Sequence, residues 1–247
     1  TNGAVTFSVA YEDSAGNAGV ADTTPDSGAV TIDNTHPTAS AVVLAVAGTG
    51  NGNNGDSMTL TITPSETIGT PTCVFKSGGA AMANTVAYST DGADHICTIA
   101  VADADTDGSV TFTLDFSDSA GNAATQVTSA SAGAVTIDNT HPTLGTVGIA
   151  TAGTGNANNG DDVTLTFTAS ETISTPTCTM NDGGGNAMDN SGSMSVAHGG
   201  SNVWTCVVET HDNDANGAMT FSIAYTDSAG NAGTADTTVD DSSTVTI

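Results

Sequence analysis

The chain repeats itself at an interval of about 105 residues. The string VTIDNTHPT occurs at residues 30–38 and again at 135–143, an offset of 105. The string DSAGNA begins at Asp13, Asp118 and Asp227, with offsets of 105 and 109. A fixed period of domain size indicates tandem copies of one small structural unit, and few architectures satisfy that constraint.

The period divides the 247 residues into three parts. Residues 33–137 and 138–247 are complete units, and residues 1–32 match the closing third of a unit. We interpret the chain as a stretch of a longer array. The alternative is a protomer whose partial unit is completed by strands from a neighbouring chain.

Within each unit, apolar and polar residues alternate, which is the pattern of half-buried β-strands. The clearest run has apolar side chains at every second position from Val110 to Phe116, and copies of it start at Val5 and Met219. A second run starts at Met58 and is copied 105 residues later. Glycine and asparagine clusters separate the runs as turns, and no segment shows helical spacing over three turns. About seven short strands per unit predict an all-β fold, with tandem β-sandwich domains arranged as a linear array.

Composition limits the function. The chain has a formal net charge of −26, and Lys76 is its one lysine or arginine. Nucleic-acid grooves and patches for anionic membranes need clustered lysine and arginine, so neither partner is expected. No apolar run reaches the roughly 18 residues of a spanning helix, so we expect no membrane insertion in this segment. Leucine, isoleucine, valine and phenylalanine make up about 17% of the residues, which favours disorder, but the repeated strand pattern outweighs this signal.

Each complete unit carries two cysteines in phase with the apolar positions of their strands. Each cysteine therefore faces inward on a separate strand, which predicts one disulfide per unit, Cys73–Cys97 and Cys178–Cys206. Closing a loop of about 25 residues stabilises the fold by roughly 3.5 kcal/mol in the chain-entropy model. Disulfides also indicate an oxidising, extracytoplasmic location. The alternative is a reduced, buried pair, whereas the Cys-x2-Cys and paired-histidine spacings of a zinc site are absent.

The order of the motifs resembles a known family. TLTITPSETI, PTC, DADTDGSVTFTLDFSDSAGNAA and AVTIDNTHPT follow one another in an order similar to that of bacterial-type Ig-like repeats. Such repeats occur in tandem in large surface adhesins and in extracellular proteins of marine microbes. The resemblance covers both complete units and the partial one, and it implies Ig-like β-sandwiches of about seven strands. Two cysteines per unit depart from the common pattern and suggest a stapled variant, and the scarcity of lysine excludes the Lys–Asn isopeptide crosslinks of some related pilin-like domains.

The resemblance also implies where the acidic loops meet. In an Ig-like topology, the loop after the second strand and the last hairpin lie where the chain enters a unit. The loop before the DSAGNA strand lies at the opposite end and faces the next unit. Carboxylates that converge at a junction repel one another unless a cation bridges them, and oxygen ligands suit Ca2+, so we predict Ca2+ at the domain junctions. The predicted ligands are Asp33, Glu66, Asp118 and Asn122 at the earlier junction, and Asp103, Asp105, Asp107, Asp138, Glu171, Asp227 and Asn231 at the later one.

Simpler interpretations of the acidic loops stay open. The Asp-x-Asp-x-Asp-Gly loop at 103–108 resembles the first half of an EF-hand, but its twelfth position is Leu114 and strands flank it, which excludes an EF-hand. The loop also suits an ordinary polar turn, in which aspartate and asparagine serve turn geometry. The aspartate and asparagine of DSAGN could likewise only close a hairpin.

Catalysis is not expected. His36 and His141 lie in the repeated Thr-His-Pro segment, where a linker or packing role is the default. No Ser-His-Asp or Cys-His arrangement can be assembled from repeated positions, and no glycine loop opens a helix to bind phosphate. We therefore predict that the chain is not an enzyme.

We expect a structural protein: an extracellular array of Ig-like repeats forming a stalk, fibre or filament on a microbial cell surface. Its expected partners are neighbouring copies of the repeat or chain, and its many serines and threonines could carry O-linked glycans. The alternative is an adhesin repeat region that binds a carbohydrate, a surface or a protein. The insertion around Gly183–Gly200, with Met188, Met194 and His198, is the candidate for such binding, although a longer loop without function explains it as well.

Overall fold

A computed structural model describes residues 2–48, 50–153, 155–188 and 194–247. These residues contain β-strands and no helix. The strands are β1 (Gly3–Ala4), β2 (Thr31–Ile32), β3 (Ala39–Val46), β4 (Asn51–Gly52), β5 (Ser57–Pro64), β6 (Thr72–Ser77), β7 (Ala80–Ala81), β8 (Ala87–Asp91), β9 (Asp94–Ala100), β10 (Gly108–Asp115), β11 (Thr136–Ile137), β12 (Leu144–Thr151), β13 (Asp162–Ala169), β14 (Thr177–Asn181), β15 (Ser195–Gly200), β16 (Val203–Glu209) and β17 (Thr220–Ala224).

Strands β3 to β11 form one sandwich. One sheet has the order β3-β5-β9-β8, and the other has the order β4-β11-β10-β6-β7. In immunoglobulin lettering these are A-B-E-D and A′-G-F-C-C′, which is the strand order of an Ig-like domain. Inward side chains of both sheets, among them Leu60, Phe75 and Phe112, share one buried cluster. The alternation seen in the sequence places these residues on the inner faces.

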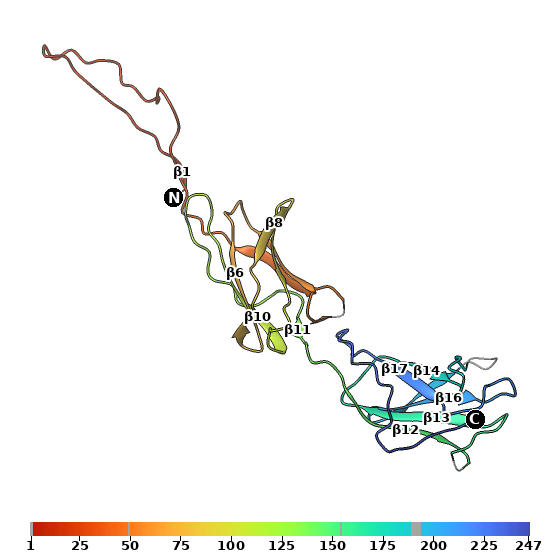
Figure 1. Ribbon diagram of the computed structural model, residues 1–247. Helices are drawn as coiled ribbons and strands as arrows, with labels where there is room; N and C mark the ends of the chain where they lie inside the picture. The colour runs from red at the N-terminus through yellow and green to blue at the C-terminus, as the bar shows by residue number, and fades with distance from the viewer. Residues whose placement is uncertain (1, 49, 154, 189–193) are drawn as a thin grey trace.

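Strands β12 to β17 form a second sandwich of the same design (Figure 1). Its first sheet has the order β12-β13-β16-β15, and β14 pairs with β17 in the second sheet. Thr246 bridges both Asn156 and Ala218, so the last residues take the place that β11 has in the first sandwich. Its buried cluster is separate and contains Phe167 and Trp204. The predicted all-β fold of tandem Ig-like β-sandwiches is confirmed.

Both predicted disulfides are present. Cys73–Cys97 joins β6 to β9, and Cys178–Cys206 joins β14 to β16. Each bond therefore links strand C of one sheet to strand E of the other. Antibody domains link strands B and F instead, so these units cross-link their two sheets at a different place.

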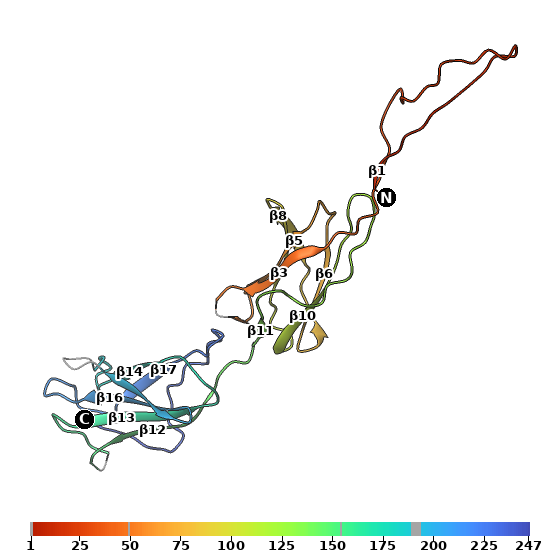
Figure 2. The same cartoon turned by 180° about the vertical axis from the view of Figure 1, so that it is seen from behind.

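Residues 2–32 form a long hairpin that projects alone from the end of the first sandwich (Figures 1 and 2). Strands β1 and β2 pair at its base, and bridges join Val9 to Asp22 and Glu12 to Ala18. None of the hairpin's side chains belongs to either buried cluster.

None of the described segments is a helix with the length and hydropathy needed to cross a bilayer.

Candidate junction site

Three carboxylates meet where the chain enters each sandwich. At the second sandwich, Asp138 comes from the connecting segment, Glu171 from the loop after β13 and Asp227 from the hairpin after β17. One ligand oxygen of each lies within 4.8 Å of the others. The first sandwich has the same arrangement of Asp33, Glu66 and Asp118. We call these two sets the carboxylate trios.

The hairpin aspartate of each trio is buried and held in a fixed orientation. Asp227 is 3% exposed, and its Oδ1 accepts N–H groups of Ala229, Gly230 and Asn231 at 2.8–2.9 Å. Its Oδ2 accepts the side-chain amide of Asn231 at 2.8 Å. This tight turn orients the carboxylate toward the other two acids before any ligand binds.

The asparagines predicted as ligands have a different part in the structure. The side-chain nitrogen of Asn231 donates to Asp227 and also to the main-chain carbonyl of Asp138 at 2.8 Å. Asn122 makes the equivalent pair of bonds to Asp118 and to the carbonyl of Asp33. Each asparagine thus ties the hairpin to the entering segment and positions two members of its trio.

One carboxylate in each trio has a shifted pKa. The pKa of Glu171 is raised above its ordinary value, first by partial burial and then by the charges of Asp138, Asp227 and Asp107. In the first trio, the pKa of Asp118 is lowered, chiefly by the hydrogen bond from the side chain of Asn122. Burial and the neighbouring negative charges thus favour the protonated form of Glu171.

Of the three aspartates predicted to reach the junction from the preceding unit, Asp107 does so. Its Oδ1 accepts the N–H of Asn139 at 2.7 Å, and its Oδ2 accepts the hydroxyl of Thr140 at 2.6 Å. Its charge also acts on Glu171. Four carboxylates therefore gather where the two sandwiches meet.

Asp105 and Asp103 do not join them. Asp105 is buried within its own sandwich, where its two oxygens accept the N–H groups of Ala83 and Ala102 at 2.7 and 2.9 Å. This carboxylate closes a polar turn, as the simpler interpretation of the loop allowed. Asp103 is exposed and belongs to neither trio among the described residues.

The connecting segment forms hydrogen bonds to both sandwiches at once. Besides its bond to Asp107, Asn139 donates its side-chain amide to the carbonyls of Ala102 and Asp105, at 3.0 and 3.1 Å. The next contacts point forward, because the carbonyl of Asp138 accepts from Asn231 and His141 Nδ1 donates to the carbonyl of Ala232 at 2.8 Å. We call residues 138–141 the junction clamp.

The junction between the hairpin and the first sandwich repeats part of this clamp. Asn2 stands at the position of Asp107, and it donates to Asp33 Oδ1 at 2.8 Å and accepts the N–H of Asn34 at 2.8 Å. His36 Nδ1 donates to the carbonyl of Ala123 at 2.7 Å, as His141 does in the second copy. The repeated Asp-Asn-Thr-His string therefore has a structural reason in both places.

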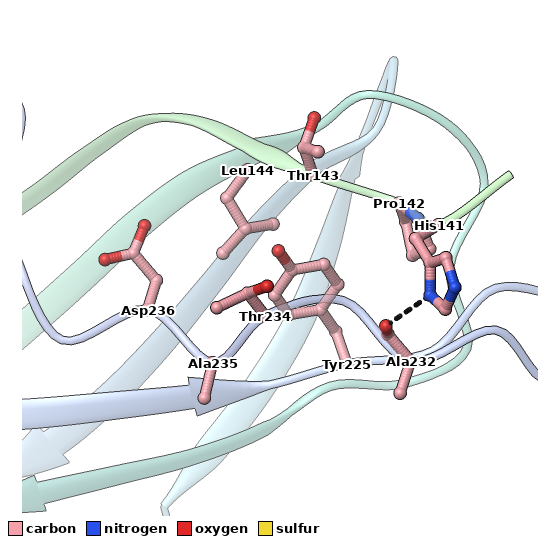
Figure 3. Close-up of a pocket in the computed structure, with 9 residues that line it drawn as sticks. All are labelled: His141, Pro142, Thr143, Leu144, Tyr225, Ala232, Thr234, Ala235 and Asp236. Atoms are coloured by element: carbon pink, nitrogen blue, oxygen red, sulfur yellow. Dashed lines mark hydrogen bonds between the residues drawn. The ribbon is translucent and has the colours of Figure 1, made fainter.

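A groove opens beside the clamp of the second sandwich. It has a volume of about 710 Å³ and is lined by residues 141–144, Tyr225, Ala232 and residues 234–236. Figure 3 shows His141 and Asp236 on opposite sides of Tyr225. The corresponding groove of the first sandwich is about 360 Å³, with Phe116 and Val127 at the positions of Tyr225 and Asp236. The groove therefore differs between the two units.

The clamp and the groove were not predicted from the sequence, although the sequence contains a pattern that marks each of them. The repetition of Asn and Thr beside Asp and His marked the clamp. An alignment of the three DSAGNA copies marks the groove, because the partial unit and the second unit share a tyrosine, a glycine and an aspartate that the first unit lacks. The insertion that we singled out lies partly outside the described residues, since 189–193 are not described.

Comparisons with known proteins find similar solved structures but no family. No protein-family model matches the chain, and no curated protein matches it. Among solved structures, it is similar to an I-band fragment of titin, with 10% identity and a TM-score of 0.45 over 87% of this chain and 65% of that one. It is also similar to tandem Ig repeats of Dlar, with 15% identity and a TM-score of 0.26 over 83% of this chain and 97% of that one. For the first eight Ig domains of Down Syndrome Cell Adhesion Molecule, the identity is 12% and the TM-score 0.38, over 95% of this chain and 34% of that one.

The strand orders of the two sandwiches define the class as a tandem Ig-like repeat protein, with one disulfide in each complete unit. The chain spans less than two thirds of the titin fragment and about a third of the cell adhesion structure. The bacterial type of the repeat stays a prediction from the sequence motifs.

Proposed function

We propose that this chain is an extracellular structural array whose Ig-like repeats form a stalk, fibre or filament on a microbial cell surface. Its role in this proposal is to supply length and stiffness, and it carries out no catalysis. Neighbouring copies of the repeat or chain are the proposed partners. The two disulfides support a secreted or extracellular setting, because such bonds persist in oxidising compartments.

The junction clamp is the observation that carries this proposal. Domains joined by an ordinary linker move freely unless their interface is large and hydrophobic. Here a segment of four residues makes hydrogen bonds to the sandwich before it and to the sandwich after it. A linear array is stabilised by such nearest-neighbour contacts, so the clamp supports a stiff rod more than a flexible chain of domains.

We also propose that the carboxylate trios bind Ca2+. The trio at Asp138 offers three carboxylates from three separate loops, and Ca2+ takes six to eight oxygen ligands, so water or main-chain carbonyls would complete the shell. Burial raises the pKa of Glu171 most, and the neighbouring carboxylates raise it further; a cation there would offset this second, electrostatic contribution. It would also attract the carboxylate of Asp107 in the preceding unit, whose charge already acts on Glu171.

Melting of the full chain in Ca2+ and in chelator tests the cation proposal. Trp204, the one tryptophan, lies in the core of the second sandwich and reports its unfolding by fluorescence. We expect Ca2+ at 100 times its Kd to stabilise this unit by about 2.7 kcal/mol. Glu171→Gln should lose this response and melt higher than the unchanged chain in chelator, whereas Glu209→Gln, an exposed control, should keep the response. Equal melting with and without Ca2+ would exclude the cation.

Small-angle scattering of the same samples tests the stiff array separately. We expect an extended profile with a narrow distribution of interdomain angles, and a broader distribution for the Asn139→Ala, Thr140→Ala variant. A profile of freely jointed domains in both Ca2+ and chelator would contradict the stalk. A stiff profile that is the same in Ca2+ and in chelator would support the stalk through the hydrogen bonds of the junction clamp, with no contribution from a cation.

One observation favours the adhesin as a second candidate. A repeat that recognises a ligand should differ from its neighbour at an exposed site, and the groove at Tyr225 and Asp236 does. The double variant Tyr225→Phe, Asp236→Val gives the second unit the side chains that the first unit has at these two positions. The same fold already accommodates these side chains in the first unit. If the groove binds a carbohydrate, binding of the chain on a glycan array should disappear in this variant. Equal glycan-array signals from the unchanged chain and the double variant, or no signal from either, would contradict the adhesin proposal.

A further inference from the structure

The hairpin of residues 2–32 exposes a row of large apolar side chains. Val5, Phe7, Val9 and Tyr11 follow one another at every second position, and their exposed fractions are 48, 41, 52 and 59%. Side chains in this spacing lie on one side of a strand. We call this side the hairpin face. Exposed apolar rows of this kind mark interaction surfaces.

The same strand is covered in the complete unit that follows. The equivalents of the hairpin face are Val110, Phe112, Leu114 and Phe116, which are 9, 5, 0 and 6% exposed. Strand β6 pairs along their edge, with Phe112 opposite Phe75, and side chains of β5 and β9 complete the buried cluster. The molecule therefore shows what kind of segment covers such a face. It is the part of a unit that precedes this strand, residues 33–105.

The tip of the hairpin already has the local contacts of a complete unit. Tyr11 packs over Gly19, where a Cβ atom would lie 2.1 Å from the ring, just as Tyr225 packs over Gly233 at 2.0 Å in the second unit. Asp13 accepts the N–H groups of Ala15 and Asn17, as Asp118 does for its own hairpin. A preorganised surface loses little conformational entropy on binding.

The base of the hairpin is also fixed. Asn2 binds Asp33 and Asn34 at the start of the first sandwich, at the place where Asp107 binds the junction clamp of the second. A partner on the hairpin face would therefore stand at the position of a preceding unit in the array.

We propose that the hairpin face is a docking surface for the opening segment of an Ig-like repeat, a polypeptide built like residues 33–105. One strand of this partner would pair with the edge of Val5–Tyr11 as β6 pairs with β10. Its disulfide-linked sheet would cover the four apolar side chains. The proposal stands independently of the cation at the junction.

Mixing experiments with the full chain test this proposal. The probe is an oxidised polypeptide with the sequence of residues 33–105, added in excess to the full chain. We expect a one-to-one complex by size-exclusion chromatography with light scattering, and at least tenfold slower amide exchange at residues 5–11. A second format fuses the same sequence ahead of residue 1, so that limited solubility of the free probe cannot hide the interaction. In the fusion, the amides of Phe7 and Val9 should exchange as slowly as those of Phe112 and Leu114.

Two variants provide the matched controls. Phe7→Asp, Val9→Asp places charges on the hairpin face and should abolish both the complex and the protection. Val20→Asp should leave them intact, because Val20 is 87% exposed and its equivalents Thr125 and Thr234 are exposed in complete units. The Trp204 melting curve should be the same in all three proteins, which verifies that the sandwiches remain folded.

Protection in either format, lost on Phe7→Asp, Val9→Asp, supports the proposal. Fast exchange at residues 5–11 in both formats overturns it. Equal binding to the charged variant also overturns it, because the probe would then have docked elsewhere. A dimer of the full chain without probe, abolished by the same variant, overturns it in favour of a second copy packed hairpin against hairpin.

Discussion

Replacing Asn231 by alanine should reveal how strongly the last hairpin is tied to the junction clamp. Asn231 is 4% exposed, and its side-chain amide donates to the carboxylate of Asp227 and to the carbonyl of Asp138, both at 2.8 Å. A hydrogen bond to a charged acceptor contributes about 2 kcal/mol and one to a neutral carbonyl about 1 kcal/mol, so the variant should lose about 3 kcal/mol. For a unit of 110 residues, 138–247, this loss corresponds to a decrease in Tm of about 13 °C.

Trp204 fluorescence during heating measures this change in the second sandwich alone. The matched control is Asn186→Ala, in a turn of the same Asp-x-x-Gly-Asn form within the same unit. Asn186 is exposed, and its side chain donates to Asp182 at 3.2 Å; among the described residues it makes no hydrogen bond to the connecting segment. We expect the control to lose less than about 1 kcal/mol, as surface substitutions usually do. A decrease for Asn231→Ala no larger than that of the control would refute the assignment of Asn231 as the tie between hairpin and clamp.

Three further predictions concern the second sandwich. Gly233→Ala should destabilise it by about 1–3 kcal/mol, because the new Cβ would lie 2.0 Å from the ring of Tyr225. Gly145→Ala is the control, since no atom lies within 4 Å of its Cβ. Equal urea midpoints for the two variants would contradict the packing of Tyr225 against Gly233. The pKa of Asp182 is lowered from 3.8 to about 2, first by the N–H of Ala215 and then by that of Asn186. A lowered carboxylate pKa adds stability above pH 3.8 that is lost as the pH falls toward 2. The urea midpoint of the unchanged chain should therefore fall more steeply between pH 3.8 and 2 than that of Asp182→Asn. Parallel pH curves for the two proteins would be inconsistent with this assignment. Reduction of the disulfide should cost about 3.5 kcal/mol, measured by chemical denaturation with and without reductant, and an unchanged midpoint would argue against the loop-closure account.

Much of the fold could be predicted from the sequence because β-strands leave a local signal. The run that starts at Met58 became β5 (Ser57–Pro64), with Met58, Leu60 and Ile62 fully buried. The same phase argument placed the four cysteines inward, and both disulfides followed. Composition suggested disorder because it counts side chains without their order, whereas alternation brings the few large apolar residues together on the inner faces.

The junction could be predicted only in part, because its details depend on contacts between distant residues. Asp105 and Asp107 are two positions apart in one loop, and nothing in the local pattern distinguishes them. Asp105 turns inward because the N–H of Ala83, 22 residues away, reaches its carboxylate. Asp107 turns outward because Asn139 and Thr140 supply donors from the next segment. The asparagines of DSAGN were assigned as ligands from their residue type, whereas the structure uses their nitrogen atoms as donors.

The position of the disulfides also determines what the chain would do under a pulling force. Each bond joins residues 24 or 28 positions apart, so the segment between them cannot lengthen when a unit is pulled open. An extended chain spans about 3.4 Å per residue, so the two bonds withhold about 80 and 95 Å of extension, roughly a quarter of what each unit could otherwise release. When such a unit is pulled open it would therefore release only about three quarters of the extension of an unlinked unit, and its covalently closed loop would remain intact.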